Sequence, residues 1–389
     1  MGFICGEAMK IAQVVRNYNK TSGISKVVAD LSEELFALGH EIHVFTNTWN
    51  NYGNSGMVFH KIPILKLNFP FEVSTFNYFS NLLVKPCDYD VVNNHSDSTV
   101  FGIYTAHSCH GFRWKEIIKD KNKLRQKESK CTSLDRYIIG MEEEVFLKKR
   151  YKKIIAVSHY LKRQIIETYG VPAEDIIVVY NAINLEEYKT PKDKIRLCIR
   201  SEHNISEEEK VLFFAGYDFR LKGLDVVIKA LGHLAQSNVK LIVVGRDREG
   251  QSIMNIFSKL ASELNIGDKV SFVGSKKNIR DYYFASDIFV FPTQSDTFGM
   301  VELEAMASGL PLIVSSSQFN GGCEIMEDGR ECFILKDHRD PVELAQKIKC
   351  LVENEELRGK MGKAAFETAQ DHSLPKMANN VLEVYKSTL

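Results

Sequence analysis

The feature that most constrains this chain is an alternation of predicted strands and helices that occurs twice along its 389 residues. In the first half, β-branched runs at 10–15, 41–46 and 153–158 alternate with amphipathic segments at 24–39 and 159–169. Further predicted strands of this half are 89–94, 102–107 and 175–180. This pattern is typical of a parallel sheet wrapped by helices.

The pattern stops at 181–194, a polar stretch with a Thr-Pro turn, where we predict a linker. It then starts again. Predicted strands are 211–216, 240–245, 270–274, 287–292 and 311–316, and predicted helices are 223–234, 252–264 and 299–308. The sequence therefore predicts an α/β fold made of two Rossmann-like doubly wound domains.

Composition excludes several classes of protein. Apolar residues make up 44% and charged residues 26%, and 50 Lys plus Arg balance 50 Asp plus Glu, which is typical of a globular protein rather than a disordered or nucleic-acid-coating one. The eight cysteines form no CxxC pair, so we expect reduced thiols and a cytoplasmic protein. We also expect no secretory signal and no membrane span, because no apolar run approaches about 20 residues.

Two loops of the second half carry a predicted anion site. In open parallel sheets, ligands bind beyond the carboxyl ends of the strands. The strand at 211–216 ends at Gly216 and leads into "GYDFRLKG", which contains Arg220 and Lys222. The strand at 287–292 leads into "TQSDTFG" and then a helix. Two cations beside a helix start predict a clamp for a diphosphate.

Backbone groups at that helix start add to the prediction. The first N–H groups of a helix have no partner within the helix, and they suit an anionic phosphate. The residues that would supply them are Phe298, Gly299, Met300 and Val301. Glycine at this point permits close approach of the ligand.

Three acids lie around the same turn, and two of them, Asp296 and Glu304, have two interpretations each. Glu304 would accept hydrogen bonds from a diol such as a ribose, and Asp296 would meet a second polyhydroxylated group. The alternative is that Asp296 caps the helix and Glu304 is a solvated helix charge. Apolar neighbours favour a functional role for Glu304, whereas Glu302 is interpreted as an ordinary solvated charge.

The block "DTFGMVELEAMASGLPLIVS" resembles the signature of the retaining GT-B glycosyltransferases of family four, the group 1 glycosyltransferases. Similar segments extend through nearly the whole chain. They are "NKTSGISKVVADLSEELFALGHEIHVFT", "AVSHYLKRQI", "VYNAINLEEY", "GYDFRLKG" and "NGGCEIMEDGRECFIL". Among the family's members, "GHEIHVFTNTW" is loosely similar to the lipopolysaccharide-core glucosyltransferases.

The resemblance implies a GT-B fold, with two domains facing each other across a cleft. It implies an acceptor-binding domain at residues 1–186, a nucleotide-sugar-binding domain at 187–372, and a C-terminal helix at about 373–389 that packs back on the first domain. It also implies transfer with retention of configuration and without a metal or other cofactor. We expect a nucleotide-diphosphate sugar as donor, with UDP favoured over GDP.

Residue roles follow from the same resemblance. Glu304 matches the acid on the ribose hydroxyls, Asp296 the acid on the donor sugar, and Lys222 the diphosphate lysine. His107, in "TAHSCHG", matches a histidine of the first domain that lies against the donor sugar, and Gly23 matches a glycine whose backbone approaches the phosphates. Without the family context, His107 could equally be a hydrogen-bonded polar residue at a strand end. Gly216 and Gly245, at two strand ends, complete the predicted donor site.

Four departures from the family pattern bear on the donor site. Asp296 stands where a glutamate is usual, Tyr217 stands where arginine is common, and Ser22 replaces the first glycine of the opening loop. The segment "GGCE" is one residue shorter than usual. Arg220, three residues after Tyr217, would supply the missing cation.

Two basic segments lie in the predicted acceptor domain, at 113–130 and 148–153. Such runs are usually solvated helix faces, yet the rest of the chain is neutral. We therefore expect an anionic membrane surface or phosphorylated glycolipid as a partner. The resemblance implies a role in cell-envelope polysaccharide or lipopolysaccharide synthesis, for a protein that is cytoplasmic or peripheral on the inner face of the cell membrane. We expect no nucleic-acid partner.

Two other functions fit the same features. One is a nucleotide-sugar epimerase or hydrolase of the same fold, which would share the diphosphate clamp. The other is a non-catalytic nucleotide-sugar binder, which the substitutions at 217 and 296 would suit. A dinucleotide oxidoreductase ranks lower because neither half has a GxGxxG loop after its first strand.

Overall fold

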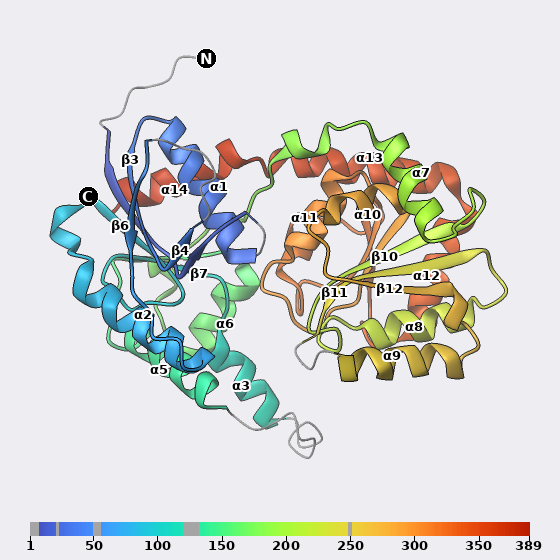
Figure 1. Ribbon diagram of the computed structural model, residues 1–389, viewed down its shortest axis with the longest axis horizontal. Helices are drawn as coiled ribbons and strands as arrows, with labels where there is room; N and C mark the ends of the chain where they lie inside the picture. The colour runs from blue at the N-terminus through green and yellow to red at the C-terminus, as the bar shows by residue number, and fades with distance from the viewer. Residues whose placement is uncertain (1–7, 21–22, 50–55, 120–131, 248–250) are drawn as a thin grey trace. The chain divides into compact units, whose positions relative to one another are not determined.

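The structure is a computed structural model that describes residues 8–20, 23–49, 56–119, 132–247 and 251–389. The chain divides into two compact units. Unit 1 comprises residues up to Asn181 together with Leu374–Leu389, and unit 2 comprises Ala182–Ser373. In Figure 1 unit 1 is blue to green with a red C-terminal helix, and unit 2 runs from green to red.

Unit 1 is built on a seven-stranded sheet with the order β5-β3-β1-β6-β7-β8-β9. All of its strand pairs are parallel, and a short parallel pair, β2 with β4, lies outside it. The strands are β1 (Lys10–Val14), β2 (Asn17–Tyr18), β3 (Glu41–Thr46), β4 (Thr48–Trp49), β5 (Val58–Lys61), β6 (Val91–His95), β7 (Ile103–Ala106), β8 (Lys153–Ala156) and β9 (Ile176–Val178). The strand order reverses between β1 and β6, which is the arrangement of a doubly wound sheet.

The helices of unit 1 carry recognisable start and stop signals. Asn68 and Ser158 cap α2 and α6, and Thr132 with Asp135 forms a capping box at the start of α5. Gly170 ends α6 in the left-handed conformation. The helices are α1 (Gly23–Ala37), α2 (Phe69–Leu83), α3 (His110–Lys119), α5 (Ser133–Phe146), α6 (His159–Tyr169) and α14 (Leu374–Lys386).

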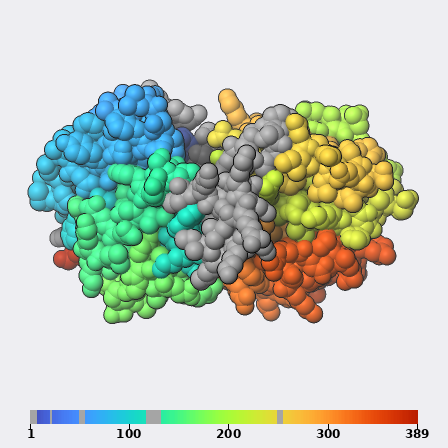
Figure 2. All heavy atoms as spheres, turned by 90° about the horizontal axis from the view of Figure 1, so that it is seen from below, coloured from blue at the N-terminus to red at the C-terminus, as the bar shows by residue number. Residues whose placement is uncertain are grey.

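The C-terminal helix α14 packs beside α1, although more than 330 residues separate them along the chain. Figure 1 shows the red helix next to the blue one, and in Figure 2 red atoms of the C-terminal end lie beside the blue and green surface of unit 1. Its apolar face includes Val381, Leu382 and Tyr385, all of which are buried. Helix α14 therefore completes the core of unit 1 rather than that of unit 2.

Unit 2 has a six-stranded sheet with the order β12-β11-β10-β13-β14-β15, again with every pair parallel. In chain order this is 3-2-1-4-5-6, the Rossmann arrangement, with the reversal between β10 and β13. Its strands are β10 (Lys210–Tyr217), β11 (Val239–Arg246), β12 (Val270–Gly274), β13 (Ile288–Phe291), β14 (Leu312–Ser315) and β15 (Cys332–Leu335). The prediction of two Rossmann-like doubly wound units is thus confirmed.

Helices cover both faces of this sheet, with α8 and α9 on one face and α10 and α11 on the other (Figure 1). The core between them holds four phenylalanines from neighbouring strands, none of them exposed to solvent: Phe213, Phe214, Phe289 and Phe291. The helices are α7 (Lys192–Glu202), α8 (Leu224–His233), α9 (Gln251–Glu263), α10 (Ile279–Ala285), α11 (Met300–Ala307), α12 (Pro341–Glu353) and α13 (Glu355–Asp371).

The division between the two units falls between Asn181 and Ala182, within the segment 181–194 where a linker was predicted. This segment also contains a 3-10 turn, Leu185–Tyr188, and the start of α7. Helix α7 is strongly polar, so hydrophobic periodicity gave little sign of it. It is held instead by Arg196 and Arg200, whose guanidinium groups lie 2.7 and 3.3 Å from the carboxylate of Asp287.

Candidate functional site

The candidate site of unit 2 lies where its strand order reverses, after the carboxyl ends of β10 and β13. The loop after β10 holds Arg220 and Lys222, and the loop after β13 holds Asp296 and leads into α11. A crevice forms at such a reversal because the connections from the two strands leave on opposite faces of the sheet. The fold therefore brings together two loops that lie about 70 residues apart in the sequence.

Lys222 and Asp296 form an ion pair at this point. The distance from Nζ to Oδ2 is 2.7 Å, and each side chain is 15% exposed. The ammonium also donates to the carbonyl of Ser295 at 3.1 Å and lies over the ring of Phe291. A mostly buried pair of this kind keeps a cation at the switch point without leaving its charge uncompensated.

Asp296 is further held by its backbone. Its N–H donates to the carbonyl of Phe319 at 2.9 Å, and its carbonyl accepts from the N–H of Gly321 at 2.8 Å. Its Oδ1 accepts from the N–H of Phe298 at 3.2 Å, which forms a tight turn before the helix. Asp296 does not cap α11, because the N-cap position is Gly299, so the capping alternative is wrong.

The start of α11 places Gly299, Met300 and Val301 at its N-cap and first two helical positions. By the geometry of a helix, these first N–H groups have no partner within it. The N–H of Phe298 differs from them, because it already donates to Asp296. Three of the four residues predicted to offer backbone donors therefore lie at the helix start itself.

Glu304 lies one turn further along α11 and is partly buried. Its Oε2 accepts a hydrogen bond from the hydroxyl of Tyr283 at 2.9 Å. Burial, followed by the negative charge of Glu304, raises the pKa of Tyr283 well above its ordinary value, so this phenol stays a donor. Sequence reasoning did not select Tyr283, because its partner is 21 residues away and on another helix.

The structure corrects the prediction made for Glu302. It was interpreted as a solvated charge, yet it is 1% exposed and lies inside the unit. Its Oε1 accepts from the amide of Asn320 at 2.6 Å, and its Oε2 has no hydrogen-bond partner among the described residues. Burial raises the pKa of Glu302 well above the usual range, while the hydrogen bond from Asn320 acts in the opposite direction.

Two glycines make room for this buried carboxyl group. A Cβ at Gly299 would lie 2.4 Å from Oε2 of Glu302, and one at Gly322 would lie 2.1 Å from it. Glu302 thus packs the start of α11 against the segment after Asn320. No sequence signal marks it, because the glycines and the amide that surround it come from separate loops.

Three other predicted residues lie around β10 and β11. Gly216 and Gly245 face each other at the strand ends, and a Cβ on Gly245 would lie 1.9 Å from the carbonyl oxygen of Gly216. Arg220 is half-buried, and its carbonyl accepts from the amide of Gln294 at 3.0 Å. Tyr217 is 47% exposed, and the guanidinium of Arg246 lies 5.8 Å from its ring centroid. Arg246 is a cation near this rim that sequence reasoning missed.

In unit 1, His107 directly follows β7 and is buried. Burial lowers its pKa to about 4, so the imidazole is uncharged at neutral pH. Its Nε2 lies 3.2 Å from Nδ1 of His95, at the end of the neighbouring strand β6. Gly23 begins α1 with a φ of +29° and is exposed, with open space where a Cβ would be. Ser22 lies outside the described residues.

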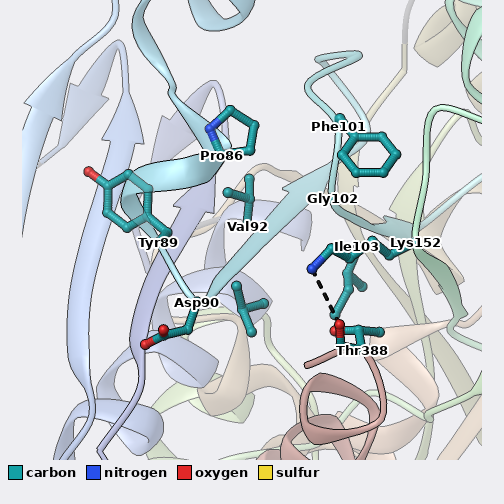
Figure 3. Close-up of a pocket in the computed structure, with 10 residues that line it drawn as sticks. Pro86, Tyr89, Asp90, Val92, Phe101, Gly102, Ile103, Lys152 and Thr388 are labelled. Atoms are coloured by element: carbon teal, nitrogen blue, oxygen red, sulfur yellow. Dashed lines mark hydrogen bonds between the residues drawn. The ribbon is translucent and has the colours of Figure 1, made fainter.

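A pocket in unit 1 lies at the opposite ends of these strands (Figure 3). Asp90, Gly102 and Lys152, which line it, come directly before β6, β7 and β8. Asp90 accepts from the backbone N–H of Lys10 at 2.7 Å, and Lys152 donates to the carbonyl of Thr388 at 3.3 Å. These contacts tie the sheet edge to the C-terminal end, so we assign the pocket a structural role.

The basic segments are only partly described. Residues 120–130 lie outside the described part of the chain, and 113–119 belong to α3. In the second segment, Arg150 pairs with Glu144 at 2.7 Å, whereas Lys148 and Lys149 are exposed. Within the described residues, no helix has the length and apolar content needed to cross a membrane.

Two Rossmann-like units, with the candidate site at the strand reversal of the second, define the GT-B class of glycosyltransferases. The sequence agrees with two family descriptions: "Glycosyltransferase Family 4" matches residues 21–187, and "Glycosyl transferases group 1" matches residues 196–368. The chain belongs to the group 1 glycosyltransferases, as its signature block predicted.

Several known proteins are similar over most of the chain. N-acetyl-alpha-D-glucosaminyl L-malate synthase of Bacillus anthracis is 26% identical over 93% of both chains. D-inositol 3-phosphate glycosyltransferase of Streptomyces scabiei is 26% identical over 78% of this chain and 69% of its own. The names of these two relatives specify different molecules, L-malate in the first and D-inositol 3-phosphate in the second.

Solved structures share the fold. WaaG, a glycosyltransferase involved in lipopolysaccharide biosynthesis, superposes with a TM-score of 0.78 at 19% identity, over 96% of this chain and 99% of its own. Anabaena HepE in complex with UDP-glucose superposes with a TM-score of 0.73 at 17% identity, over 97% of this chain and 100% of its own. At these identities the superpositions establish the fold alone.

Proposed function

We propose that this glycosyltransferase moves a hexose, with retention of configuration, from a nucleotide-diphosphate sugar to a hydroxyl of a glycan or glycolipid. The observation that carries the proposal is the contact of Lys222 with Ser295 and Asp296, in the loop that leads into α11 at the strand reversal of unit 2. A cation beside unpaired helix N–H groups is a setting for a diphosphate. The complex of the similar HepE with UDP-glucose supports a UDP-sugar as donor.

The proposed chemistry depends on stabilising the leaving group. Negative charge develops on the nucleotide diphosphate as the glycosidic bond breaks, so fixed cations and N–H groups beside it lower the barrier. We assign this role to Lys222, Arg220 and the start of α11. We assign the ribose hydroxyls to Glu304 and the donor sugar to Asp296 and His107. The departing phosphate takes the proton of the acceptor hydroxyl, so no enzyme nucleophile is required.

Calorimetric titration with UDP, GDP and ADP, and then with their hexose conjugates, tests the donor site. We expect UDP and one UDP-hexose to bind. Glu304→Gln should weaken UDP by roughly tenfold, because an acceptor for the ribose becomes partly a donor, whereas Glu353→Gln, at the exposed end of α12, should have no effect. Binding of none of the three nucleotides would reject the proposal.

Product analysis tests the reaction itself. NMR of the product should show the same anomeric configuration as the donor, and EDTA should leave turnover unchanged. Incubation with donor alone separates the alternatives: an epimerase would convert the sugar, a non-catalytic binder would leave it intact, and a transferase would hydrolyse it slowly. An inverted product would contradict the retaining mechanism.

We further propose that unit 1 meets an anionic membrane surface that carries the acceptor in cell-envelope polysaccharide synthesis. Exposed Lys148 and Lys149 follow α5, and the neighbouring helix α2 exposes Phe69, Tyr78 and Leu82. Bases beside apolar side chains suit an anionic lipid surface. Sedimentation with vesicles tests this: binding should require anionic lipid and weaken in Lys148→Glu. Equal binding to neutral vesicles would contradict it.

A further inference from the structure

A chain of buried polar side chains runs through unit 1 from His107 to the C-terminal helix. Its members lie on β1, β6, β7 and α14, except for His107, which directly follows β7, and all are buried. In order from the strand ends they are His107, His95, Gln13, Tyr385, Asn93 and Thr105. Buried polar groups cost stability unless they are hydrogen-bonded, so a connected set of six is a specific arrangement rather than a by-product of packing.

The distances along this chain are those of ordinary hydrogen bonds. His107 Nε2 lies 3.2 Å from His95 Nδ1, and His95 Nε2 lies 2.9 Å from Gln13 Oε1. The amide nitrogen of Gln13 donates to the hydroxyl of Tyr385 at 3.2 Å, and that of Asn93 donates to the same hydroxyl at 2.7 Å. Thr105 donates to Asn93 Oδ1 at 2.8 Å. In this arrangement both amide nitrogens face the tyrosine hydroxyl, and the oxygen of Gln13 faces His95.

These orientations determine which ring nitrogens carry protons. The oxygen of Gln13 can only accept, so Nε2 of His95 must carry a hydrogen. An uncharged His95 then has its lone pair on Nδ1, and Nε2 of His107 must be the donor to it. Both histidines are uncharged in a neutral solution, because burial lowers the pKa of His95 well below its usual value and that of His107 to about 4.

We propose that His95 is a positioning residue which, together with Gln13 and Tyr385, holds His107 as an uncharged imidazole with its hydrogen on Nε2. Nδ1 of His107 then carries the lone pair and can only accept a hydrogen bond. In the proposed reaction, this chemistry suits a sugar hydroxyl and excludes His107 as a proton donor. Only this consequence for the reaction rests on the proposed function; the tautomer itself does not.

NMR of histidine labelled with ¹⁵N tests the tautomer directly, with His107→Asn and His95→Gln variants to assign the two rings. We expect both rings to show the nitrogen shifts of an uncharged imidazole protonated at Nε2. Tyr385→Phe should give His107 a mixture of both tautomers. Tyr151→Phe is the matched control. It removes the hydroxyl of another buried tyrosine of unit 1, which donates to Asp175 and does not belong to this row of polar side chains.

Two substitutions of His95 separate positioning from packing. In His95→Gln the amide can still accept from His107 and donate to Gln13, so the Nε2 tautomer of His107 should persist. His95→Leu removes both functions, and the tautomer should become mixed. The proposal would be overturned if His107 of the unsubstituted protein were protonated at Nδ1. It would also be overturned if the spectrum of His107 were unchanged in both Tyr385→Phe and His95→Leu.

Turnover of the donor gives the functional readout. Tyr385→Phe should lower kcat by about three- to tenfold, the factor that one hydrogen bond is worth, with little change in KM. If the unsubstituted protein has the Nε2 tautomer but kcat is unchanged in Tyr385→Phe, the row of buried polar side chains is structural only, and the positioning role is overturned. Failure of any nucleotide to bind would instead count against the proposed function, since the NMR result does not depend on it.

Discussion

Nζ of Lys222 lies 2.7 Å from Oδ2 of Asp296, and this ion pair joins the two loops that meet at the strand reversal of unit 2. The residues are 74 positions apart and come from β10 and β13 connections. Each compensates the charge of the other in a setting that is mostly removed from solvent. A ligand phosphate would therefore meet a lysine whose position is already determined by the protein.

The first prediction concerns Lys222→Ala. Loss of a charged hydrogen-bond donor should weaken UDP binding by roughly ten- to hundredfold and lower turnover of an intact donor at least as much. Lys229→Ala is the matched control, because Lys229 pairs with Asp225 on the exposed face of α8. Calorimetry and donor turnover check both variants. Near-normal turnover in Lys222→Ala would show that this lysine is not at the diphosphate.

The second prediction concerns Glu302→Gln and pH. The folded pKa of Glu302 is raised above its unfolded value of 4.5, chiefly by burial. The folded protein thus holds a proton that the unfolded chain releases, and stability from this group falls as pH rises above 4.5. The glutamine variant keeps an oxygen to accept from Asn320 and has no proton to lose. Its free energy of unfolding should exceed that of the unsubstituted protein by an amount that grows with pH.

Calorimetric unfolding between pH 4.5 and 8 measures this difference. Glu353→Gln, an exposed residue of α12, should show no such trend. A constant difference across the pH range, or a destabilised Glu302→Gln at pH 8, would mean that Glu302 is ionised in the folded state.

The third prediction concerns His107 and acid. Its folded pKa of about 4 lies below the ordinary value of 6.5 because of burial, so the unfolded chain binds a proton that the folded one does not. Stability from this group is therefore present above pH 6.5 and is lost as pH falls from 6.5 toward 4. His107→Gln should reduce this acid sensitivity, whereas the exposed His159→Gln should not.

Tryptophan fluorescence during urea unfolding suits this measurement. The two tryptophans of the chain, Trp49 and Trp114, both belong to unit 1, so their signal follows the unit that contains His107. An identical pH slope in His107→Gln and in the unsubstituted protein would contradict the assignment of an uncharged, buried imidazole.

The fourth prediction concerns Gly245→Ala. Gly245 has a φ of +130°, and an added Cβ would lie 1.9 Å from the carbonyl oxygen of Gly216. The backbone conformation alone should cost about 1–3 kcal/mol, and the collision should add to this. Hydrogen exchange of peptides from β10 and β11 should rise accordingly. Gly359→Ala, in the middle of α13 with open space for a Cβ, should instead stabilise its helix by about 0.5–1 kcal/mol. Unchanged exchange in Gly245→Ala would show that the two strands can separate freely at this end.

Local chemistry by itself determined the elements and their class. The apolar runs that predicted strands at 211–216 and 287–292 match β10 and β13 closely, because burial on both faces of a parallel sheet requires continuous apolar stretches. The signature block from Asp296 to Glu304 was recognisable for a related reason: a loop, a helix start and a following acid occupy consecutive positions along one segment.

Tertiary structure decided everything that joins distant segments. From its position in the sequence Glu302 was interpreted as a solvated charge. In the structure, Asn320 and two glycines from separate loops enclose it. Helix α7 is strongly polar and is held through Asp287, which the sequence places 91 residues from Arg196. Tyr385 reaches the interior of unit 1 from the far end of the chain. Such contacts depend on how the elements pack, and local propensity carries no information about a partner that lies elsewhere in the chain.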